Sequence, residues 1–382
     1  MSLKKTYILL VSLALMSTSL LKAQQDSRVI TTGVPFLLIT SDARSAGMGD
    51  LGVATSVDVF SQQWNPAKYG FSSKEKAVGV SYTPYLSKLV NDIFLGNITY
   101  FNKVNDRSVW ATSLKYFSLG EIQFNDLIGN NIVQQGIERP NELTLDVSYG
   151  LLLSENFSLA IALRYIRSDL KLSTDLDASA ASSFGVDIAG FYEGNSFDLG
   201  ANTAFMRYGF NISNIGPRLR YDQGGETNFI PTNLRVGTGL NLLLDTSNQV
   251  SFNLEFNKLL VPSPVEVYSN GELRGYAQPD ISFLSGIFTS FSDAPDGLSE
   301  ELSEITWALG VEYLFENAFA VRTGYFNESL DKGSRRFLTF GTGFVFDFTS
   351  VDISYLLSTS KIRNPLENTL RFSLTFDLGG SY

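Results

Sequence analysis

The chain has 382 residues, no cysteine and no histidine, and a formal net charge of −10 at pH 7. These features exclude disulfides, thiolate nucleophiles, histidine-based metal sites and a Ser-His-Asp triad, and they disfavour nucleic acid as a partner. Charged residues are 18% and aromatic residues 13% of the chain, an unusual pairing for a soluble domain, in which roughly a quarter of residues are charged. No stretch after residue 23 is long and apolar enough for a membrane helix, so contact with a membrane requires a closed barrel.

The first 23 residues are typical of a secretory signal peptide. Lys4 and Lys5 precede an apolar stretch over residues 7–15, and cleavage after Ala23 fits the small-residue rule for that position. A transmembrane anchor is the alternative, but polar side chains interrupt the stretch and leave the apolar run too short to span a bilayer. We therefore predict a signal peptide at residues 1–23.

A glycine-rich stretch, SAGMGDLGVA at residues 45–54, raises the question of dinucleotide binding. Gly47, Gly49 and Gly52 have the G-x-G-x-x-G spacing with which a βαβ unit holds a pyrophosphate. Such a unit also needs a crossover helix and an acidic residue about 20 positions downstream. The nearest candidate acid, Glu75, lies between two lysines, and the strands that follow have no crossover helices between them. We expect the glycines to permit close backbone packing instead.

Residues 24–75 precede the first predicted strand. This segment is too long for a tail and too apolar to remain loose. We expect it to fold into the barrel described next and to plug its lumen.

From Lys76 onward, apolar and polar residues alternate with a period of two, which no helix produces. The segment TLRFSLTFDL near the C-terminus is an example. About fourteen such segments of roughly ten residues follow one another, which is the length that crosses a bilayer at a tilt. A soluble β-sandwich would carry many charges on its polar face, whereas here that face is mostly Gly, Ser, Thr, Ala and Asn. The sequence predicts an all-β fold, a transmembrane antiparallel β-barrel over residues 76–382.

The connections between the predicted strands alternate in length. Short turns are expected at 104–107, 154–156, 193–196, 245–248, 316–317 and 347–349, and long loops at 119–141, 172–181, 213–231, 261–303 and 358–367. Outer-membrane barrels have short periplasmic turns, long extracellular loops and, with an even strand number, both termini on the periplasmic side. We therefore expect the long loops, of which 261–303 is the largest, to be extracellular.

The loop at 261–303 contains an apolar run, ISFLSGIFTSF at residues 281–291. An extracellular loop should be polar unless it has a partner, so Phe283, Phe288 and Phe291 are candidate partner contacts. The alternative is that the run folds back over the lumen as a lid. The nearby acids could bind calcium, but they lack regular ligand spacing and are interpreted as a solvated loop face; they are Asp293, Asp296, Glu300 and Glu301. We predict no metal site and no cofactor.

Residues 35–54, followed by WNPA at 64–67, resemble the N-terminal region of the PorV family, a branch of the FadL-like outer-membrane barrels. The residues that carry this resemblance are Asp42, Arg44, Gly47, Met48, Gly49, Trp64, Asn65 and Pro66. Of these, Asp42 and Arg44 are expected to form an ion pair within the plug. The Trp64-Asn65-Pro66 step is expected to fix a turn.

The resemblance implies a non-enzymatic component of the type IX secretion system in the outer membrane of a Bacteroidota bacterium. Members of this family dock on the side of the translocon barrel SprA (Sov). They receive cargo through its C-terminal domain and pass it to the attachment complex that contains PorU. The expected partners are therefore this translocon, its cargo, the attachment complex and outer-membrane lipid.

Two alternatives remain. A FadL-like transporter of small hydrophobic molecules would need an apolar lumen, against which several predicted lumen charges count: Arg164, Arg235, Glu255, Glu312, Arg322 and Arg371. Deacylase activity has been suggested for relatives, but without histidine it would need a Ser-Lys or carboxylate site, and the sequence shows no such constellation.

Overall fold

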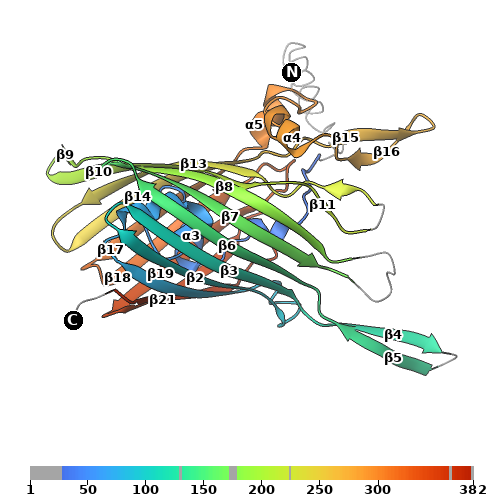
Figure 1. Cartoon of the computed structure of the whole chain (residues 1–382), viewed down its shortest axis with the longest axis horizontal. Helices are drawn as coiled ribbons and strands as arrows, with labels where there is room; N and C mark the ends of the chain where they lie inside the picture. The colour runs from blue at the N-terminus through green and yellow to red at the C-terminus, as the bar shows by residue number, and fades with distance from the viewer. Residues whose placement is uncertain (1–27, 129–130, 172–178, 223–224, 361–363, 380–382) are drawn as a thin grey trace, which may run out of the picture.

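The computed structural model describes residues 28–128, 131–171, 179–222, 225–360 and 364–379. Fourteen antiparallel strands form one closed barrel, because β1 pairs with β21 as well as with β2 (Figure 1). They are β1 (Lys76–Pro84), β2 (Ile93–Asn105), β3 (Ser108–Leu119), β6 (Asn141–Leu152), β7 (Phe157–Asp169), β8 (Ala181–Glu193), β10 (Asn202–Ile215), β13 (Asn233–Leu243), β14 (Asn248–Leu259), β17 (Thr306–Phe315), β18 (Phe319–Asn327), β19 (Arg336–Phe346), β20 (Thr349–Ser358) and β21 (Leu370–Asp377). The predicted all-β barrel is confirmed.

Most outward-facing side chains of the strands are apolar, and most inward-facing ones are small or polar, although some large apolar side chains such as Leu95 and Phe101 are buried in the lumen. In β21, Leu370 and Phe372 are 48% and 42% exposed, whereas Arg371 and Ser373 are 1% exposed. An apolar outer surface is stable only in contact with hydrocarbon or another apolar surface. The alternation therefore fits an outer-membrane barrel. Among the described residues, no helix is long and apolar enough to cross a membrane.

Short turns gather at one end of the barrel and long loops at the other, as the connection lengths predict. The long-loop end has three hairpins and two helices: β4 (Ile122–Ile128) with β5 (Asn131–Glu138), β11 (Leu219–Arg220) with β12 (Thr227–Asn228), β15 (Val265–Ser269) with β16 (Glu272–Ala277), α4 (Phe283–Thr289) and α5 (Leu298–Ser303). The short β9 (Phe197–Leu199) extends the sheet beside β10 at the opposite end (Figure 1). The predicted signal peptide, residues 24–27 of the predicted plug and parts of the 119–141, 172–181, 213–231 and 358–367 loops lie outside the described residues.

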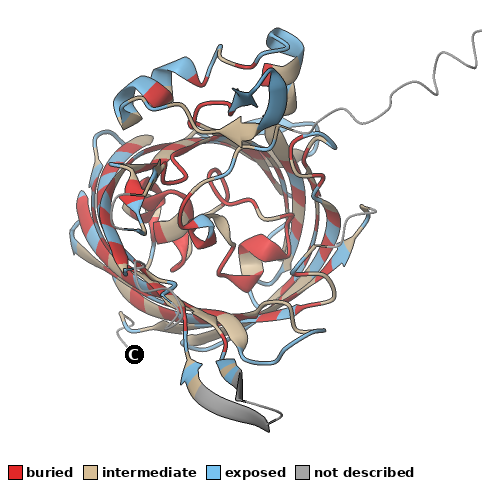
Figure 2. Ribbon diagram, turned by 90° about the vertical axis from the view of Figure 1, so that its right-hand side faces the viewer, coloured by how far each residue is buried: buried red, intermediate tan, exposed pale blue. Residues whose placement is uncertain are grey.

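Residues 28–75, here called the N-terminal segment, pass through the ring of strands. The segment forms η2 (Pro35–Leu38), α2 (Ala43–Ala46), α3 (Ser61–Trp64) and η3 (Pro66–Phe71). Figure 2 shows its short helices inside the ring, where α2 contacts β19, β20 and β21 and η3 contacts β6, β7 and β8.

The N-terminal segment begins at the long-loop end of the barrel, where Arg28 forms an ion pair with Asp296 at 3.0 Å. It ends at the short-turn end, where Lys76 starts β1. The first described residue therefore lies at the end opposite to Asp377, the last residue of β21. This differs from the expectation that both termini lie on one side of the membrane, because the segment crosses the lumen before the first strand begins.

Candidate functional site

The glycine-rich stretch lies against glycines of the barrel wall. A Cβ atom on Gly324 of β18 would lie 2.1 Å from the carbonyl carbon of Met48, and one on Gly310 of β17 would lie 2.6 Å from the Met48 oxygen. Gly49 has a φ of +84°, which favours glycine, and its N–H donates to the Thr339 hydroxyl at 2.8 Å. The wall and the segment thus touch backbone to backbone.

The other two motif glycines also permit close approach. A Cβ on Gly47 would lie 3.0 Å from the Cα of Gly341 in β19, and one on Gly52 would lie 2.4 Å from the Trp64 ring. The N–H groups of Gly52 and Val53 both donate to one Glu255 carboxylate oxygen at 2.8 Å. The loop therefore does hold an anion, but that anion is a carboxylate of the protein's own β14.

Asp42 and Arg44 do not pair with each other, which corrects the sequence-based expectation. Asp42 accepts hydrogen bonds from the Trp64 indole N–H at 2.7 Å and from the Ser45 N–H at 2.8 Å, so it caps α2 and fixes the tryptophan. Burial raises the pKa of Asp42 above its usual range. Arg44, two positions further on, points the other way, toward the barrel wall, because side chains two positions apart at a helix do not face each other.

Arg44 forms ion pairs with Asp58 at 2.7 Å and with Glu312 of β17 at 2.9 Å. Glu312 also accepts from Arg322 of β18 at 2.6 Å, and Arg322 donates to Asp352 of β20 at 2.7 Å. Five groups of alternating charge thus connect the N-terminal segment to three strands of the wall, β17, β18 and β20. Although burial opposes its charge, Lys68 and Arg44 hold the pKa of Asp58 below its usual range.

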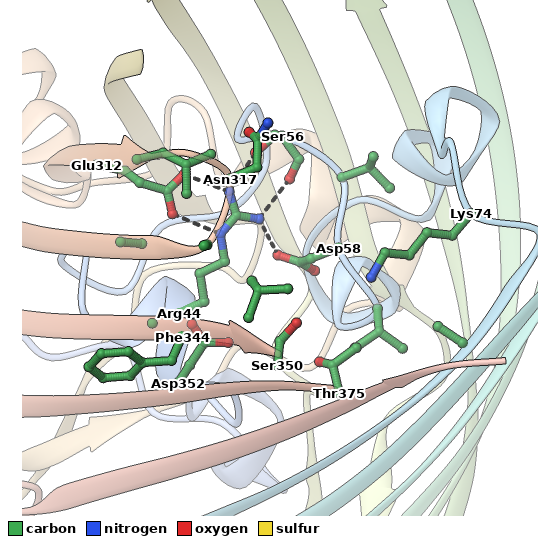
Figure 3. A pocket seen from close by; sticks show the side chains of 18 of the residues that line it. Arg44, Ser56, Asp58, Lys74, Glu312, Asn317, Phe344, Ser350, Asp352 and Thr375 are labelled. Carbon is green, nitrogen blue, oxygen red and sulfur yellow. Dashed lines mark hydrogen bonds and ion pairs between the residues drawn. The ribbon is translucent and has the colours of Figure 1, made fainter. Parts of the chain in front are cut away.

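This charge row borders a cavity of about 380 Å³ between the segment and the wall near the short-turn end (Figure 3). Lys74, Ser350 and Thr375 supply further polar lining, and Phe344 and Val59 supply apolar lining. In Figure 3 the guanidinium of Arg44 points toward Asp58 and Glu312. Because its charges are paired with one another, the cavity presents a balanced rather than a strongly charged surface.

Asn65 joins the turn to the wall. Its side-chain oxygen accepts from the Ala67 N–H at 3.1 Å, which caps η3, and Pro66 occupies the first position of that helix. Its amide group donates to the Val53 oxygen at 3.0 Å and to the Gly190 oxygen of β8 at 2.9 Å. One side chain thus fixes the turn, the glycine-rich stretch and the barrel relative to one another.

Lys68 lies beside the Thr55 hydroxyl, at 3.0 Å, and also donates to the Gly52 oxygen at 2.9 Å. Burial lowers the pKa of Lys68 to about 8, so the pair has the composition of a hydroxyl–lysine dyad. However, Lys68 and Thr55 are 0% and 2% exposed, and neither lines the cavity. The arrangement satisfies buried polar groups at the interface between segment and wall.

A second region of interest lies on α4 and α5. Five large apolar side chains are exposed on these helices and, for Phe291, just after α4. We call them the α4–α5 patch: Leu284, Phe288, Phe291, Leu298 and Leu302, at 53%, 75%, 51%, 75% and 60%. Of the three phenylalanines singled out in the sequence, Phe283 is only half-exposed and does not belong to the patch. Figure 2 shows both helices outside the ring of strands and not across its opening, so they do not form a lid.

Two of the four acids beside the patch, Glu300 and Glu301, form ion pairs, which corrects their interpretation as a solvated loop face, whereas Asp296 pairs with Arg28 but stays exposed. Glu304 contacts Lys258 of β14 at 2.8 Å and Lys332 at 3.0 Å, and all three side chains are buried. Glu301 pairs with Lys258 at 3.0 Å, and Glu300 pairs with Lys332 at 2.6 Å. We call Lys258, Glu300, Glu301, Glu304 and Lys332 the ion cluster. Within the described residues, no group of acids has the arrangement of a metal site.

These partners could not be identified from the sequence. Lys258 lies in β14 and Lys332 in the connection between β18 and β19, whereas α5 belongs to the connection between β14 and β17. Glu312 is 268 positions from Arg44. The only signal of these partners in the sequence was the presence of charged residues at inward-facing strand positions. Such residues predict that a charge needs a partner in the lumen, but not which residue supplies it.

The chain is similar to known proteins in structure and in sequence family. The P. putida toluene transporter TodX is similar in structure, with a TM-score of 0.53, 12% identity, and coverage of 90% of this chain and 100% of that chain. A Pseudomonas aeruginosa FadL homologue gives a TM-score of 0.47 with 11% identity, covering 91% of this chain and 99% of that one. No curated protein sequence matches. The family model for the type IX secretion system protein PorV matches residues 22–266, and the chain therefore belongs to the PorV family.

Proposed function

We propose that this outer-membrane barrel docks on the SprA (Sov) translocon, receives cargo by its type IX C-terminal domain, and shuttles it to the PorU-containing attachment complex. Membership of the PorV family supports a role in type IX secretion. The observation that carries the docking step is the α4–α5 patch. A group of large exposed apolar side chains beside buried ion pairs is typical of a protein interaction site.

In this proposal the lumen is not the route of the cargo. The N-terminal segment closes it, since the backbone contacts at Met48, the hydrogen bond from Gly52 to Glu255 and the Arg44–Glu312 ion pair attach the segment to β14, β17 and β18. A folded cargo protein would have to displace all of these contacts. Cargo is therefore handled on the outer surface of the barrel, where a few well-buried anchors can supply most of the binding free energy.

A FadL-like transporter of small hydrophobic molecules is the second candidate. The cavity of about 380 Å³ beside the N-terminal segment favours it, because that volume suits a small molecule. Buried charges oppose a continuous apolar path through the lumen. Arg164 lies between Asp146 and Asp187, with nitrogen–oxygen distances of 2.5 and 3.1 Å, in the wall formed by β6, β7 and β8.

The test is a triple variant with Phe288→Ser, Phe291→Ser and Leu302→Ser. Partner capture from detergent-solubilised outer membranes should fall on the order of a hundredfold, because each anchor contributes roughly 1–3 kcal/mol. Leu89→Ser, at a 78% exposed leucine in the β1–β2 loop, is the matched control. Heat-dependent gel migration confirms that each barrel has assembled.

Surface-protein secretion and hydrophobic-solute uptake are then measured in the same strains. The docking proposal requires that the triple variant lose secretion and keep uptake. Loss of uptake with normal secretion would establish the transporter instead. Normal secretion in a complete deletion strain that has no paralogue would contradict a role in the type IX pathway.

A further inference from the structure

The helix α5 has an inverted distribution of side chains. Glu300, Glu301 and Glu304 face the protein, where the ion cluster neutralises them. Leu298 and Leu302 face away and are 75% and 60% exposed. A surface helix in water normally has the opposite arrangement, with its apolar stripe against the protein and its charges in solvent. The outer side of α5 is therefore suited to an apolar surrounding.

The ion cluster also shows on which side of the barrel wall α5 lies. Along β14, Glu255 and Asn253 face the lumen and are buried, whereas Phe252 and Phe256 face outward and are each 46% exposed. Lys258 has the same parity as Phe256, so it too points outward. Lys258 is nevertheless buried, because Glu301 and Glu304 of α5 cover it. Hence α5 packs on the outer side of the wall.

The level of α5 relative to the bilayer follows from the same strand. Lys258 is two residues beyond the outward-facing Phe256, a distance of about 7 Å along a strand. Phe256 pairs in register with Trp307 of β17, and the Trp307 ring lies 5.6 Å from that of Tyr325 on β18. Outward-facing aromatic residues near strand ends form the girdle that marks a membrane interface. The helix α5 therefore lies at or just above the edge of the hydrocarbon.

We propose that the α4–α5 patch lies in the outer leaflet of the outer membrane when the barrel is free, so that the two helices form a lateral membrane-interface anchor. The lipid surface is chosen because the patch is outside the ring (Figure 2), next to the aromatic girdle, and apolar on the side that faces away from the wall. Amphipathic helices with buried apolar faces bind the boundary between headgroups and acyl chains in this way.

This inference deepens the proposed docking function and rests on it in one respect: a docking partner would have to reach the patch within the plane of the membrane and displace lipid from it. The lipid contact itself is a property of the isolated barrel. It can therefore be tested without any partner, and its failure would leave the secretion role open.

The experiment uses the natural absence of cysteine. Single variants Phe288→Cys and Leu302→Cys carry a nitroxide label, and the purified full-length barrel is reconstituted into vesicles of phosphatidylethanolamine and phosphatidylglycerol. Accessibility to oxygen, which concentrates in lipid, is compared with accessibility to a water-soluble nickel chelate. Phe256→Cys is the lipid-facing control, and Tyr268→Cys on β15, where the tyrosine is 59% exposed, is the water-facing control.

The proposal requires oxygen-to-nickel ratios at positions 288 and 302 that approach the ratio at position 256 and exceed that at position 268 at least severalfold. Ratios equal to that at position 268 would overturn it, because the patch would then face water. Low accessibility to both reagents would also overturn it, since another protein surface would then cover the patch. Leu298→Cys provides an independent position if either label disturbs the loop, and heat-dependent gel migration confirms assembly of every variant.

Discussion

Gly324 of β18 faces Met48 so closely that a Cβ atom on the glycine would lie 2.1 Å from the Met48 carbonyl carbon. Neighbouring hydrogen bonds hold the backbone at Gly324 and at Met48, so neither backbone can move away easily. The inward-facing glycines of β17, β18 and β19 thus form a surface against which the segment packs. This contact connects the glycine-rich sequence motif to the packing of the N-terminal segment against the barrel wall.

Gly324→Ala should destabilise the assembled barrel, because the added methyl group separates the N-terminal segment from the wall. Overpacking of this kind costs about 1–3 kcal/mol or more. The measurement is the temperature at which the heat-modifiable band is lost on gels. Gly96→Ala in β2 is the control, since its Cβ would meet no atom closer than 3.8 Å. Equal midpoints for the two variants would contradict the packing role of Gly324.

Arg44→Met should destabilise the barrel more than Gly324→Ala does, because it leaves the buried carboxylates of Asp58 and Glu312 without the cation that they share. Breaking a buried ion pair from one side costs about 3–5 kcal/mol. The half-exposed pair of Lys74 with Asp377, at 3.4 Å, is the matched control, and Lys74→Met should cost less than about 1 kcal/mol. Arg44→Lys retains the charge but loses the bidentate contact with Glu312. The temperature at which its heat-modifiable band is lost should therefore lie between those of Arg44→Met and Lys74→Met.

The intact barrel should conduct ions poorly in planar bilayers, because the N-terminal segment occupies its lumen (Figure 2). Gly324→Ala, if it inserts, should show larger or more frequent openings than the Gly96→Ala control. Single-channel recording at fixed salt and voltage measures both. A large and steady conductance from the unmodified protein would exclude a closed lumen.

Acidification should loosen α5. Burial opposes the charge of Glu300, but its hydrogen bonds with Lys332 and the Asp296 N–H, together with Arg28, hold its pKa below the ordinary 4.5. A carboxyl group whose folded pKa is depressed contributes stability that is fully present above about pH 4.5 and is lost as the pH falls through the lower folded value. A nitroxide at Leu302→Cys should therefore become more mobile below pH 4.5.

Glu300→Gln is the control for this titration. In that background the label should already be more mobile at pH 7, and the change on acidification should be smaller. If the two proteins gave the same pH profile, the loosening would have to come from other groups, and Glu300 would have no part in it.

The barrel could be predicted from the sequence because one physical rule governs every strand. A strand between lipid and a polar lumen must alternate, and β21 shows this alternation in its sequence as clearly as in its exposure. The lengths of the connections likewise predicted which end has the hairpins. These signals are local, so they require no knowledge of which strands are neighbours in the closed sheet.

The pairings within the site could not be predicted, because they join residues that only the closed barrel brings together. The sequence suggested an ion pair between Asp42 and Arg44. In the structure, Asp42 accepts from the indole N–H of Trp64, and Arg44 donates to Glu312. The inversion of α5 was hidden for a similar reason. A six-residue helix has too few positions to show a period, and its charged side is set by Lys258 and Lys332.

The mature N-terminus should be accessible at the cell surface. Arg28 forms ion pairs with Asp296 and Glu300 of the 261–303 loop at 3.0 and 3.7 Å, and Lys332 donates to the Arg28 carbonyl oxygen at 3.1 Å. These contacts hold the start of the N-terminal segment at the long-loop end. Because long loops of outer-membrane barrels are extracellular, an epitope tag inserted immediately before Arg28 should bind antibody on intact cells.

A tag inserted after Ser247, in the short turn between β13 and β14, is the matched control and should be reached only after permeabilisation. The reverse pattern would show that the barrel has the opposite orientation. If neither tag were accessible on intact cells, the start of the N-terminal segment would not be exposed at the cell surface, and the prediction would be wrong. Arg28→Glu should weaken this attachment by opposing Asp296 and Glu300 with a like charge. It should therefore increase protease cleavage within 261–303 on intact cells, while Arg107→Glu, in the β2–β3 turn at the other end, should leave cleavage unchanged.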